Sequence, residues 1–267
     1  MADSNAYDVV IIGSGPGGYV AAVRAAQLGL KTACVEKWPR LGGVCLNVGC
    51  IPSKALLDSS EYFHLAKTQL ASHGITTGTL GMDIAKMMAR KEQVVKELTD
   101  NVRKLLENHK VTLVQGTAKL TGRQQVEVAS EAGSRTLTAP NIILATGSEP
   151  LAPAGLAFDG KIILSSTEAL RLDAVPERLG IVGGGYIGLE LGSVWMRLGS
   201  KVTVIEMLPE IATTLDGQVR RRLQSILKKQ GFTFRLGTRV KSATVSNGRA
   251  AVEVESDQKS ETLEVDT

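Results

Sequence analysis

Apolar runs and helix-length segments alternate in two stretches of the chain that share one pattern. Residues 7–37 read YDVVIIGSGPGGYVAAVRAAQLGLKTACVEK, and residues 178–207 read RLGIVGGGYIGLELGSVWMRLGSKVTVIEM, offset by 170 residues (Gly13 against Gly183). Each stretch opens with an apolar run typical of a buried parallel strand, continues with a helix-length segment and returns to a second apolar run. The pattern predicts two strand–helix–strand units in an α/β protein.

The remaining stretches predict simpler elements. Apolar positions at spacings of three and four over residues 82–110 predict an amphipathic helix that covers one face of a sheet. Short β-type runs over residues 111–144 predict a small meander leading back into the first sheet, and residues 150–160 predict an interdomain connection. Two further elements are expected, a helix over residues 216–230 and short strands over residues 233–265 with a turn at Asn247–Gly248.

Both repeated units carry glycines in the G-x-G-x-x-G spacing after the first strand and an acid at the end of the second strand. The first glycine allows a tight turn, the second lets the backbone approach a pyrophosphate, and the third lets helix and strand pack closely. The helix N-terminus offers free N–H groups to phosphates, and the acid binds ribose hydroxyls. A glycine-rich turn without a ligand is the alternative, but strand, helix and acid all occur in place, so each unit predicts a dinucleotide site. These residues are Gly13, Gly15, Gly18 and Glu36 in the first unit and Gly183, Gly185, Gly188 and Glu206 in the second.

The carboxylate of Glu206 also bears on the choice of cofactor. It suits the free 2′-hydroxyl of NAD and would repel the 2′-phosphate of NADP, so we expect NAD at the second site. Two dinucleotide sites are typical of enzymes that pass electrons between a flavin and a nicotinamide. Position alone does not assign the flavin to either site.

Two of the three cysteines lie in the segment LGGVCLNVGCIPSK, residues 41–54. Pro52 follows Cys50 closely, and proline is favoured in the first turn of a helix. We therefore expect Cys50 at or just before a helix N-terminus, where the helix dipole stabilises a thiolate. Lys54, one turn further on, adds positive charge nearby. The pattern predicts a reactive pair, Cys45 and Cys50.

A metal site is the competing interpretation of these cysteines. Zinc usually needs four ligands in paired short spacings, and no second Cys or His pair lies nearby in the sequence. His64, His73 and His109 stand singly, so we expect no metal. Cys34 lies within an apolar run and is expected to be a small buried residue.

Composition narrows the class of protein. Hydrophobic residues make up 43% of the chain, which is ordinary for a globular protein, and a net charge of +4 argues against nucleic acid as the main partner. No apolar run reaches the ~18 residues of a membrane span, and the short polar N-terminus resembles neither a signal nor a transit peptide, so we expect a cytoplasmic protein without membrane partners. Three cysteines are too few for a structural framework, so a disulfide here is expected to be catalytic.

The cysteine segment is similar to the active-site signature of the pyridine nucleotide–disulfide oxidoreductases, and CLNVGCIPSKALL resembles their dihydrolipoamide dehydrogenase branch. The resemblance covers nearly all of the chain. One departure is Val44, where the family usually has threonine; the change bears on local packing and removes no reacting atom. The resemblance assigns FAD to the first glycine motif and implies further site residues: Lys54, Gly116, Ala145, Thr146 and Gly147 for FAD, Tyr186 at the nicotinamide entrance, and Glu190 as the acid that pairs with Lys54.

The implied fold is two Rossmann-like dinucleotide-binding domains, an FAD-binding domain over residues 1–149 that carries the small β-meander and a redox-active disulfide, and an NAD-binding domain over residues 150–267. The implied reaction oxidises dihydrolipoamide through a Cys45–Cys50 disulfide and FAD, with NAD⁺ as the hydride acceptor. Cys45 is the interchange thiol in this scheme. The implied partner is the lipoamide-bearing protein of a 2-oxo acid dehydrogenase complex or of the glycine cleavage system.

The resemblance also implies segments that these residues do not contain. They are a second flavin segment, the last strand of the NAD domain, and a C-terminal domain that forms the homodimer and supplies a His–Glu pair. We therefore expect the 267 residues alone to turn over dihydrolipoamide poorly or not at all. Two alternatives stay open: another disulfide reductase of the same fold, acting on mercuric ion or a glutathione-like disulfide, and a non-catalytic nucleotide-binding fragment.

Overall fold

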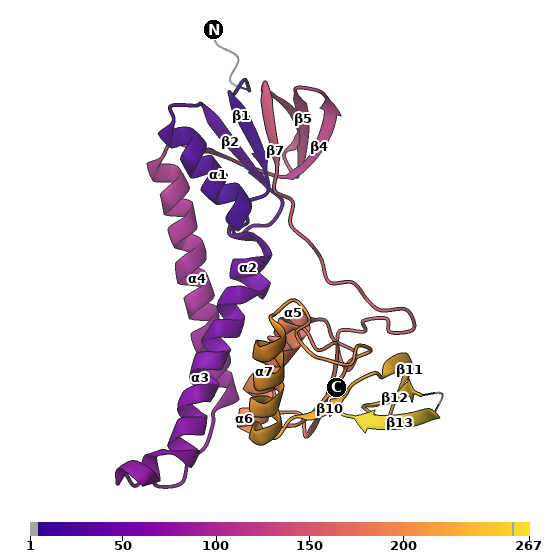
Figure 1. The fold of residues 1–267 in the computed structure, drawn as a ribbon. Helices are drawn as coiled ribbons and strands as arrows, with labels where there is room; N and C mark the ends of the chain where they lie inside the picture. Colours follow the sequence, from indigo (N-terminus) through magenta and orange to yellow (C-terminus); the bar gives the residue numbers. More distant parts are fainter. Residues whose placement is uncertain (1–4, 258) are drawn as a thin grey trace. The chain divides into compact units, whose positions relative to one another are not determined.

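The computed structural model describes residues 5–257 and 259–267. The chain divides into two compact units, one of residues up to 52 with residues 92–149, and one of residues 53–91 with residues 150–267 (Figure 1). Residues 53–91, which the sequence assigned to the first domain, group with the second unit because Leu56 and Met87 are buried in its core.

The first unit contains a parallel sheet with the strand order β3-β2-β1-β7. Strands β1 (Val9–Ile12) and β2 (Thr32–Glu36) are buried along their whole length, which is why both read as unbroken apolar runs. Helix α1 (Pro16–Gln27) connects them, as predicted. The flanking strands are β3 (Thr112–Gln115) and β7 (Asn141–Leu144).

The predicted meander and the predicted long helix are both present. The antiparallel strands of the meander are β4 (Thr117–Gly122), β5 (Gln125–Ser130) and β6 (Gly133–Thr138). Helix α4 (Ile84–Asn108) buries Val102 and Leu106 in one cluster with residues of β1 and α1. Its apolar stripe therefore covers a face of the first sheet in the way its spacing predicts.

The second unit repeats the strand–helix–strand pattern of the first. Strands β8 (Arg178–Val182), β9 (Lys201–Ile205) and β10 (Thr233–Arg235) form a parallel sheet in the order β10-β9-β8. Helix α6 (Tyr186–Leu198) connects β8 to β9. The pairing register of β8 with β9 equals that of β1 with β2 at the offset of 170 residues, so Leu179↔Val202 corresponds to Val9↔Thr32.

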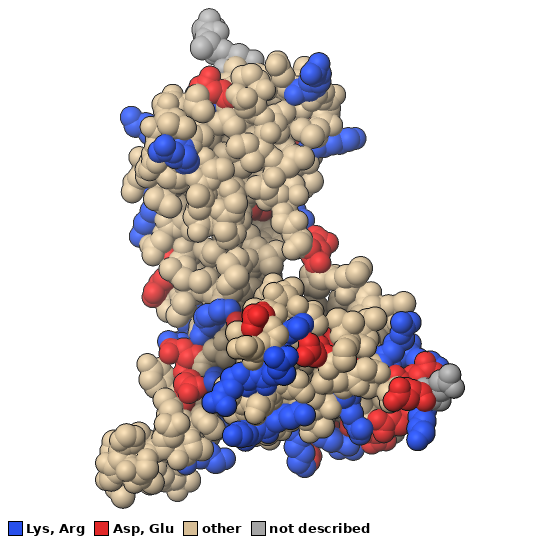
Figure 2. Space-filling model, in the orientation of Figure 1, with Lys and Arg blue, Asp and Glu red and all other residues tan. Residues whose placement is uncertain are grey.

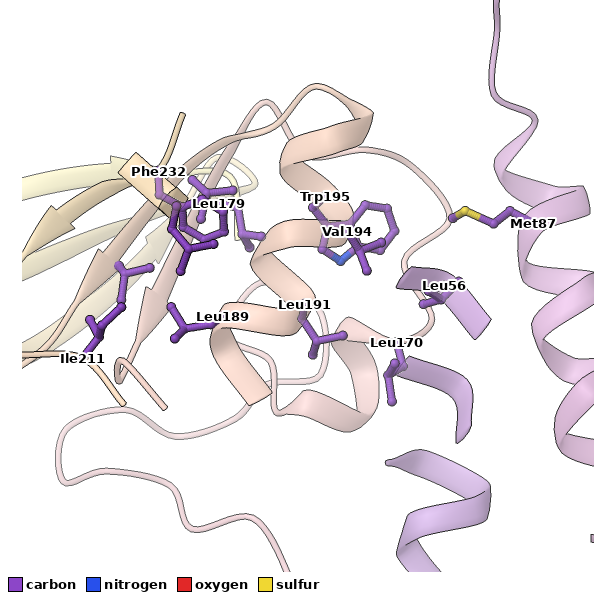
Figure 3. Close-up of a cluster of buried hydrophobic side chains, with 13 residues drawn as sticks. Leu56, Met87, Leu170, Leu179, Leu189, Leu191, Val194, Trp195, Ile211 and Phe232 are labelled. Atoms are coloured by element: carbon purple, nitrogen blue, oxygen red, sulfur yellow. The ribbon is translucent and has the colours of Figure 1, made fainter. Parts of the chain in front are cut away.

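Helix α6 lies at the centre of the largest apolar core of the second unit (Figure 3). Leu189 lies on the side of the helix toward Leu179 and Phe232 of the sheet region. Trp195, which is fully buried, lies on the other side toward Leu56 and Met87. Apolar residues occupy several faces of α6, which is typical of a buried helix rather than an amphipathic surface helix.

The remaining elements follow from shorter patterns. Helix α7 (Gly217–Gln230) confirms the predicted helix, and Asn247 and Gly248 form the predicted turn with φ of 50° and 74°. Two short helices, α2 within the cysteine segment and α5, were not predicted. The other elements are α2 (Gly43–Val48), α3 (Cys50–Thr68), η1 (Leu70–His73), α5 (Ser166–Ala169), β11 (Arg239–Ser246), β12 (Arg249–Ser256) and β13 (Lys259–Val265). Within the described part of the chain, no helix combines the length and apolarity needed to span a membrane.

Candidate functional site

The two glycine motifs share the same backbone hydrogen bonds. The N–H of Gly13 donates to the carbonyl of Val35 at 2.8 Å, and the N–H of Gly183 donates to the carbonyl of Ile205 at 2.8 Å. Both glycines have a left-handed φ, 103° and 102°, which favours glycine. The repeat that the sequence predicts therefore extends to the turn that would hold a nucleotide.

The first motif has no room for side chains. A Cβ on Gly18 would lie 1.8 Å from the carbonyl oxygen of Gly13, and a Cβ on Gly13 would lie 2.2 Å from that of Ala145. Helix α1 starts after Gly15 without a side-chain cap, so its first N–H groups remain available to an anion. This close packing fits a pyrophosphate that is bound by backbone groups.

Glu36 lies at the end of β2, beside this turn, and is buried. Its carboxylate accepts hydrogen bonds from the N–H of Ser14 at 2.9 Å, the hydroxyl of Ser14 at 2.6 Å and the N–H of Trp38 at 2.9 Å. A carboxylate has about four acceptor positions, so it can still accept a bond from a ribose hydroxyl. The predicted adenosine-ribose acid is thus held in a fixed orientation.

Ser14 is a site residue that the sequence analysis missed. Its hydroxyl is fully buried, donates to Glu36 and accepts from the N–H of Gly42 at 3.2 Å. The carbonyl of Ser14 also accepts from Gly42, at 3.0 Å. Ser14 therefore joins the nucleotide motif to the start of the cysteine segment. The residue between the first two glycines of G-x-G-x-x-G can be of any type, so the motif itself does not indicate this role.

Two more predicted segments lie beside this turn. The N–H of Gly116 donates to the carbonyl of Glu36 at 2.9 Å, and a Cβ on Gly116 would lie 2.5 Å from the carbonyl oxygen of Ala129. The N–H of Ala145 donates to the carbonyl of Ile12 at 2.8 Å. Thr146 and Gly147 follow on the exposed side. The carboxyl ends of the parallel strands thus gather these residues at one sheet edge, where dinucleotides bind in folds of this kind.

The cysteine segment forms two helices with a glycine between them. Cys45 lies in α2 and is partly buried, and Cys50 is exposed and opens α3, as predicted. A Cβ on Gly49 would lie 2.9 Å from the carbonyl oxygen of Val44 and 3.2 Å from the Cα of Cys45. Only glycine lets the chain turn back this closely before Cys50. Gly49 was not singled out from the sequence.

Cys34 differs from these two residues. It is fully buried in β2, and burial, assisted by the charge of Glu36, raises the pKa of its thiol to about 12. The thiol therefore stays protonated at neutral pH and is a small buried residue, as predicted. Within the described residues, no three His, Cys, Asp or Glu side chains are grouped so that they could hold a metal ion.

The second motif holds its acid in the same way. The Glu206 carboxylate accepts from the N–H of Gly184 at 2.6 Å and from that of Leu208 at 2.8 Å, positions that correspond to Ser14 and Trp38 at the offset of 170 residues. A Cβ on Gly188 would lie 2.7 Å from the side chain of Ile181. These glycines leave room for a nucleotide beside a fixed carboxylate, so the second motif also fits a dinucleotide.

A cavity of about 440 Å³ opens beside the second motif. It is lined by the glycine turn, by Tyr186, Glu190 and Glu206, and by the loop that follows β9. Tyr186 is the first residue of α6 and is 70% exposed. Gly183, whose Cβ would meet no atom within 4 Å, precedes this turn.

Lys54 and Glu190 form an ion pair within the second unit. The Lys54 Nζ lies 2.7 and 2.8 Å from the two carboxylate oxygens of Glu190, and the hydroxyl of Ser53 donates to the same carboxylate at 3.4 Å. The side chains are 57% and 30% exposed. The pairing of Lys54 with Glu190 that the resemblance implies is present in the structure.

Comparison with known proteins agrees with this geometry. Residues 7–267 match the family model described as pyridine nucleotide-disulphide oxidoreductase. The chain is 47% identical to the mitochondrial dihydrolipoyl dehydrogenase of Pisum sativum over 94% of its length and 50% of that protein, and 46% identical to the dihydrolipoyl dehydrogenase of Cupriavidus necator over 98% and 57%. The HOCl-induced flavoprotein disulfide reductase RclA of Escherichia coli superposes with a TM-score of 0.79 at 28% identity, covering 98% of this chain and 55% of that one.

The chain spans about half the length of the curated relatives that it matches. The cofactors of this family are FAD and NAD(H), and the two glycine turns with their fixed acids provide a cradle for each. The matched model covers nearly the whole chain, and so this protein belongs to the pyridine nucleotide-disulphide oxidoreductase family.

Proposed function

We propose that the whole protein is a dihydrolipoyl dehydrogenase. It oxidises dihydrolipoamide carried on a partner protein and passes the electrons to NAD⁺. The observation that carries the proposal is the cysteine pair, with Cys50 at a helix start and the segment tied by Ser14 to a dinucleotide motif. The relatives in pea and Cupriavidus necator that carry the name dihydrolipoyl dehydrogenase support this choice of substrate.

The chemistry of the two cysteines is thiol–disulfide exchange. A thiolate of the substrate attacks the Cys45 sulfur of a Cys45–Cys50 disulfide, and Cys50 leaves as a thiolate. The second substrate thiolate then attacks the substrate sulfur of the mixed disulfide, and Cys45 leaves as a thiolate. The substrate thus loses two electrons to the cysteines, and its two thiol protons pass to solvent. FAD and NAD⁺, when bound, take up these two electrons in turn.

The other predicted residues receive supporting roles. We assign the first dinucleotide to an FAD-binding domain over residues 1–149 and the second to an NAD-binding domain over residues 150–267. The FAD residues are Gly13, Gly15, Gly18, Glu36, Lys54, Gly116, Ala145, Thr146 and Gly147, and the NAD residues are Gly183, Gly185, Tyr186, Gly188 and Glu206. Glu190 orients the ammonium group of Lys54, and the pair is included with the cysteines among the catalytic residues because the resemblance implies it.

The exchange step can be tested on the full-length protein. The FAD-loaded protein is oxidised, mixed anaerobically with one equivalent of dihydrolipoamide and alkylated, and each of the three cysteines is then quantified by peptide mass spectrometry. We expect Cys45 and Cys50 to change from disulfide to alkylated thiols, and Cys34 to stay constant as an internal control. Retention of the disulfide would overturn the proposed substrate, and faster reduction by glutathione would favour the glutathione-like alternative.

Partners, assembly and location are proposed on the same basis. The partner is a lipoamide-bearing protein of a 2-oxo acid dehydrogenase complex or of the glycine cleavage system, and the full-length enzyme is a homodimer. The cytoplasmic location stays a prediction, since relatives include proteins named as mitochondrial. Weak or absent turnover by the 267 residues alone also stays a prediction, checked by NADH formation with dihydrolipoamide in excess.

A further inference from the structure

The cavity beside the second glycine motif holds a carboxylate that the proposed function does not use. Glu206 and Glu210 both line the cavity, together with the loop residues Ala212, Thr213, Thr214 and Leu215. Glu206 is already assigned to the adenosine ribose. Glu210 lies four residues further along the loop and is a second acid in the lining of this cavity.

Glu210 is paired with an arginine of α7. The Nη2 of Arg220 lies 3.0 Å from the Glu210 carboxylate, and the Nη1 of Arg220 donates to the carbonyl of Thr213 at 3.4 Å. The side chains of Arg220 and Glu210 are 24% and 34% exposed. The Nε of Arg220 is buried and has no hydrogen-bond partner among the described residues. The guanidinium therefore lies behind the cavity lining, bonded to two residues that form it, Glu210 and Thr213.

The position of Arg220 on α7 explains why it faces this wall. Arg220, Leu223 and Leu227 are spaced three and four residues apart and share one face of the helix, and both leucines line the cavity. Arg221 and Arg222 are exposed, in contrast to Arg220. Figure 2 shows basic side chains gathered over α7 on the solvent side. Arg220 is thus the arginine of this cluster that turns inward.

An arginine in this position would suit a different cofactor. A guanidinium is the preferred partner of a 2′-phosphate, and a dinucleotide with a free 2′-hydroxyl has no need of it. Glu210 neutralises this guanidinium, so the positive charge of Arg220 is not offered to a phosphate. Arg197, which also lines the cavity, lies near the C-terminal end of α6 and is paired with Glu61.

We propose that Glu210 masks Arg220, and that the Glu210–Arg220 pair acts with Glu206 to select a dinucleotide whose adenosine ribose carries a free 2′-hydroxyl. The inference rests on the proposed assignment of the second motif to NAD. Glu210 and Arg220 are specificity-determining residues in this scheme and take no part in electron transfer.

Direct binding tests the proposal without any redox reaction. Isothermal titration measures the dissociation constants of ADP-ribose and 2′-phospho-ADP-ribose for the unmodified chain and for E210Q, R220Q and the double variant E210Q/R220Q. We expect E210Q to improve binding of the 2′-phosphorylated probe relative to ADP-ribose roughly ten- to a hundredfold, the effect of one charge-assisted hydrogen bond. The double variant should lose this gain, because Arg220 supplies it.

A matched control removes the same charge elsewhere in the unit. Glu177 pairs with Lys201 at 3.1 Å and does not line the cavity, so E177Q should leave the ratio of the two constants unchanged. Equal ratios in E210Q and the unmodified chain, or a gain that persists in E210Q/R220Q, would overturn the masking proposal alone. An unmodified chain that binds neither probe would overturn the NAD assignment and this inference together.

Discussion

Replacement of Ser14 by alanine removes one hydroxyl from a fully buried position and leaves the neighbouring backbone in place. The hydroxyl donates a hydrogen bond to the Glu36 carboxylate at 2.6 Å. In the alanine variant, Glu36 still accepts hydrogen bonds from the N–H groups of residue 14 and of Trp38. The N–H of Gly42 still donates to the carbonyl of residue 14, at 3.0 Å. The loss is therefore one hydrogen bond to a charged group, about 2 kcal/mol, or roughly a thirtyfold fall in the folding equilibrium constant of the first unit.

The measurement is urea unfolding with a separate probe for each unit. Flavin fluorescence reports the first unit, and the buried Trp195 reports the second unit in a Trp38→Phe background. Ser193→Ala is the matched control, because its hydroxyl is also buried but donates to a neutral carbonyl, that of Leu189, at 2.7 Å. We expect Ser193→Ala to cost about 1 kcal/mol or less and to act on the second unit.

The comparison of the two serines decides whether the charge of Glu36 is what matters. Equal losses from Ser14→Ala and Ser193→Ala would contradict the charge-assisted bond. A loss under about 0.5 kcal/mol from Ser14→Ala would show that the hydroxyl does not hold Glu36 in place. In the second case the link between the nucleotide motif and the cysteine segment would rest on the backbone bond from Gly42 to the Ser14 carbonyl.

Three further predictions follow from single contacts. Gly49→Ala should slow formation of the motif disulfide in oxidised glutathione several-fold, because its Cβ would lie 2.9 Å from a carbonyl oxygen; Gly78→Ala, which meets nothing within 4 Å, is the control, and equal rates would refute the steric argument. Cys34, with its pKa near 12, should resist iodoacetamide at pH 8 in the folded chain, and modification at the rate of Cys50 would show that it is accessible. The N–H of Arg178 holds the pKa of Asp266 below its ordinary value, so the stability it provides is present above the unfolded pKa of about 4 and is lost as pH falls through the folded value. Asp266→Asn should therefore flatten the acid side of a thermal-unfolding profile, and an unchanged slope would contradict this.

The fold was predictable where local pattern and buried environment agree. Strands β1 and β2 are buried along their whole length, so they read as unbroken apolar runs, and Gly13 and Gly18 must be glycine because a Cβ on either would strike backbone. The start of α3 at Cys50 follows from proline in its first turn. The grouping of residues 53–91 with the second unit was not predictable, since it depends on distant packing of Leu56 and Met87.

The site was predictable in its motifs and not in the contacts that join them. Ser14 sits at a position where the motif allows any residue, and its role arises only when β2 brings Glu36 beside the turn. The pair Glu210–Arg220 crosses a loop without a recurrent spacing, so no periodicity connects the two residues. Helix α2 was missed because its first residues are glycine and valine, which have low helix propensity.

The repeat continues beyond the acid at the end of the second strand. In the first unit the N–H of Gly42 donates to the carbonyl of Ser14 at 3.0 Å, and in the second unit the N–H of Ala212 donates to the carbonyl of Gly184 at 2.8 Å. These positions differ by the same 170 residues. Both Gly42 and Ala212 have a left-handed φ, 95° and 48°. The loop after the second strand is therefore fastened to the glycine turn in the same way in both copies.

This correspondence explains where the cysteine segment lies. At the same offset, Cys45 corresponds to Leu215, which lines the cavity beside the second motif. The position that holds Cys45 in helix α2 of the first copy thus forms part of a cavity wall in the second. The two copies differ at the turn itself. In the second copy Ile211 occupies the space that a side chain at Gly184 would need. In the first copy the corresponding residue is Ser14, whose hydroxyl binds both Glu36 and the N–H of Gly42. The start of the cysteine segment is therefore fastened to the first glycine turn, whereas the corresponding loop of the second copy lines the cavity.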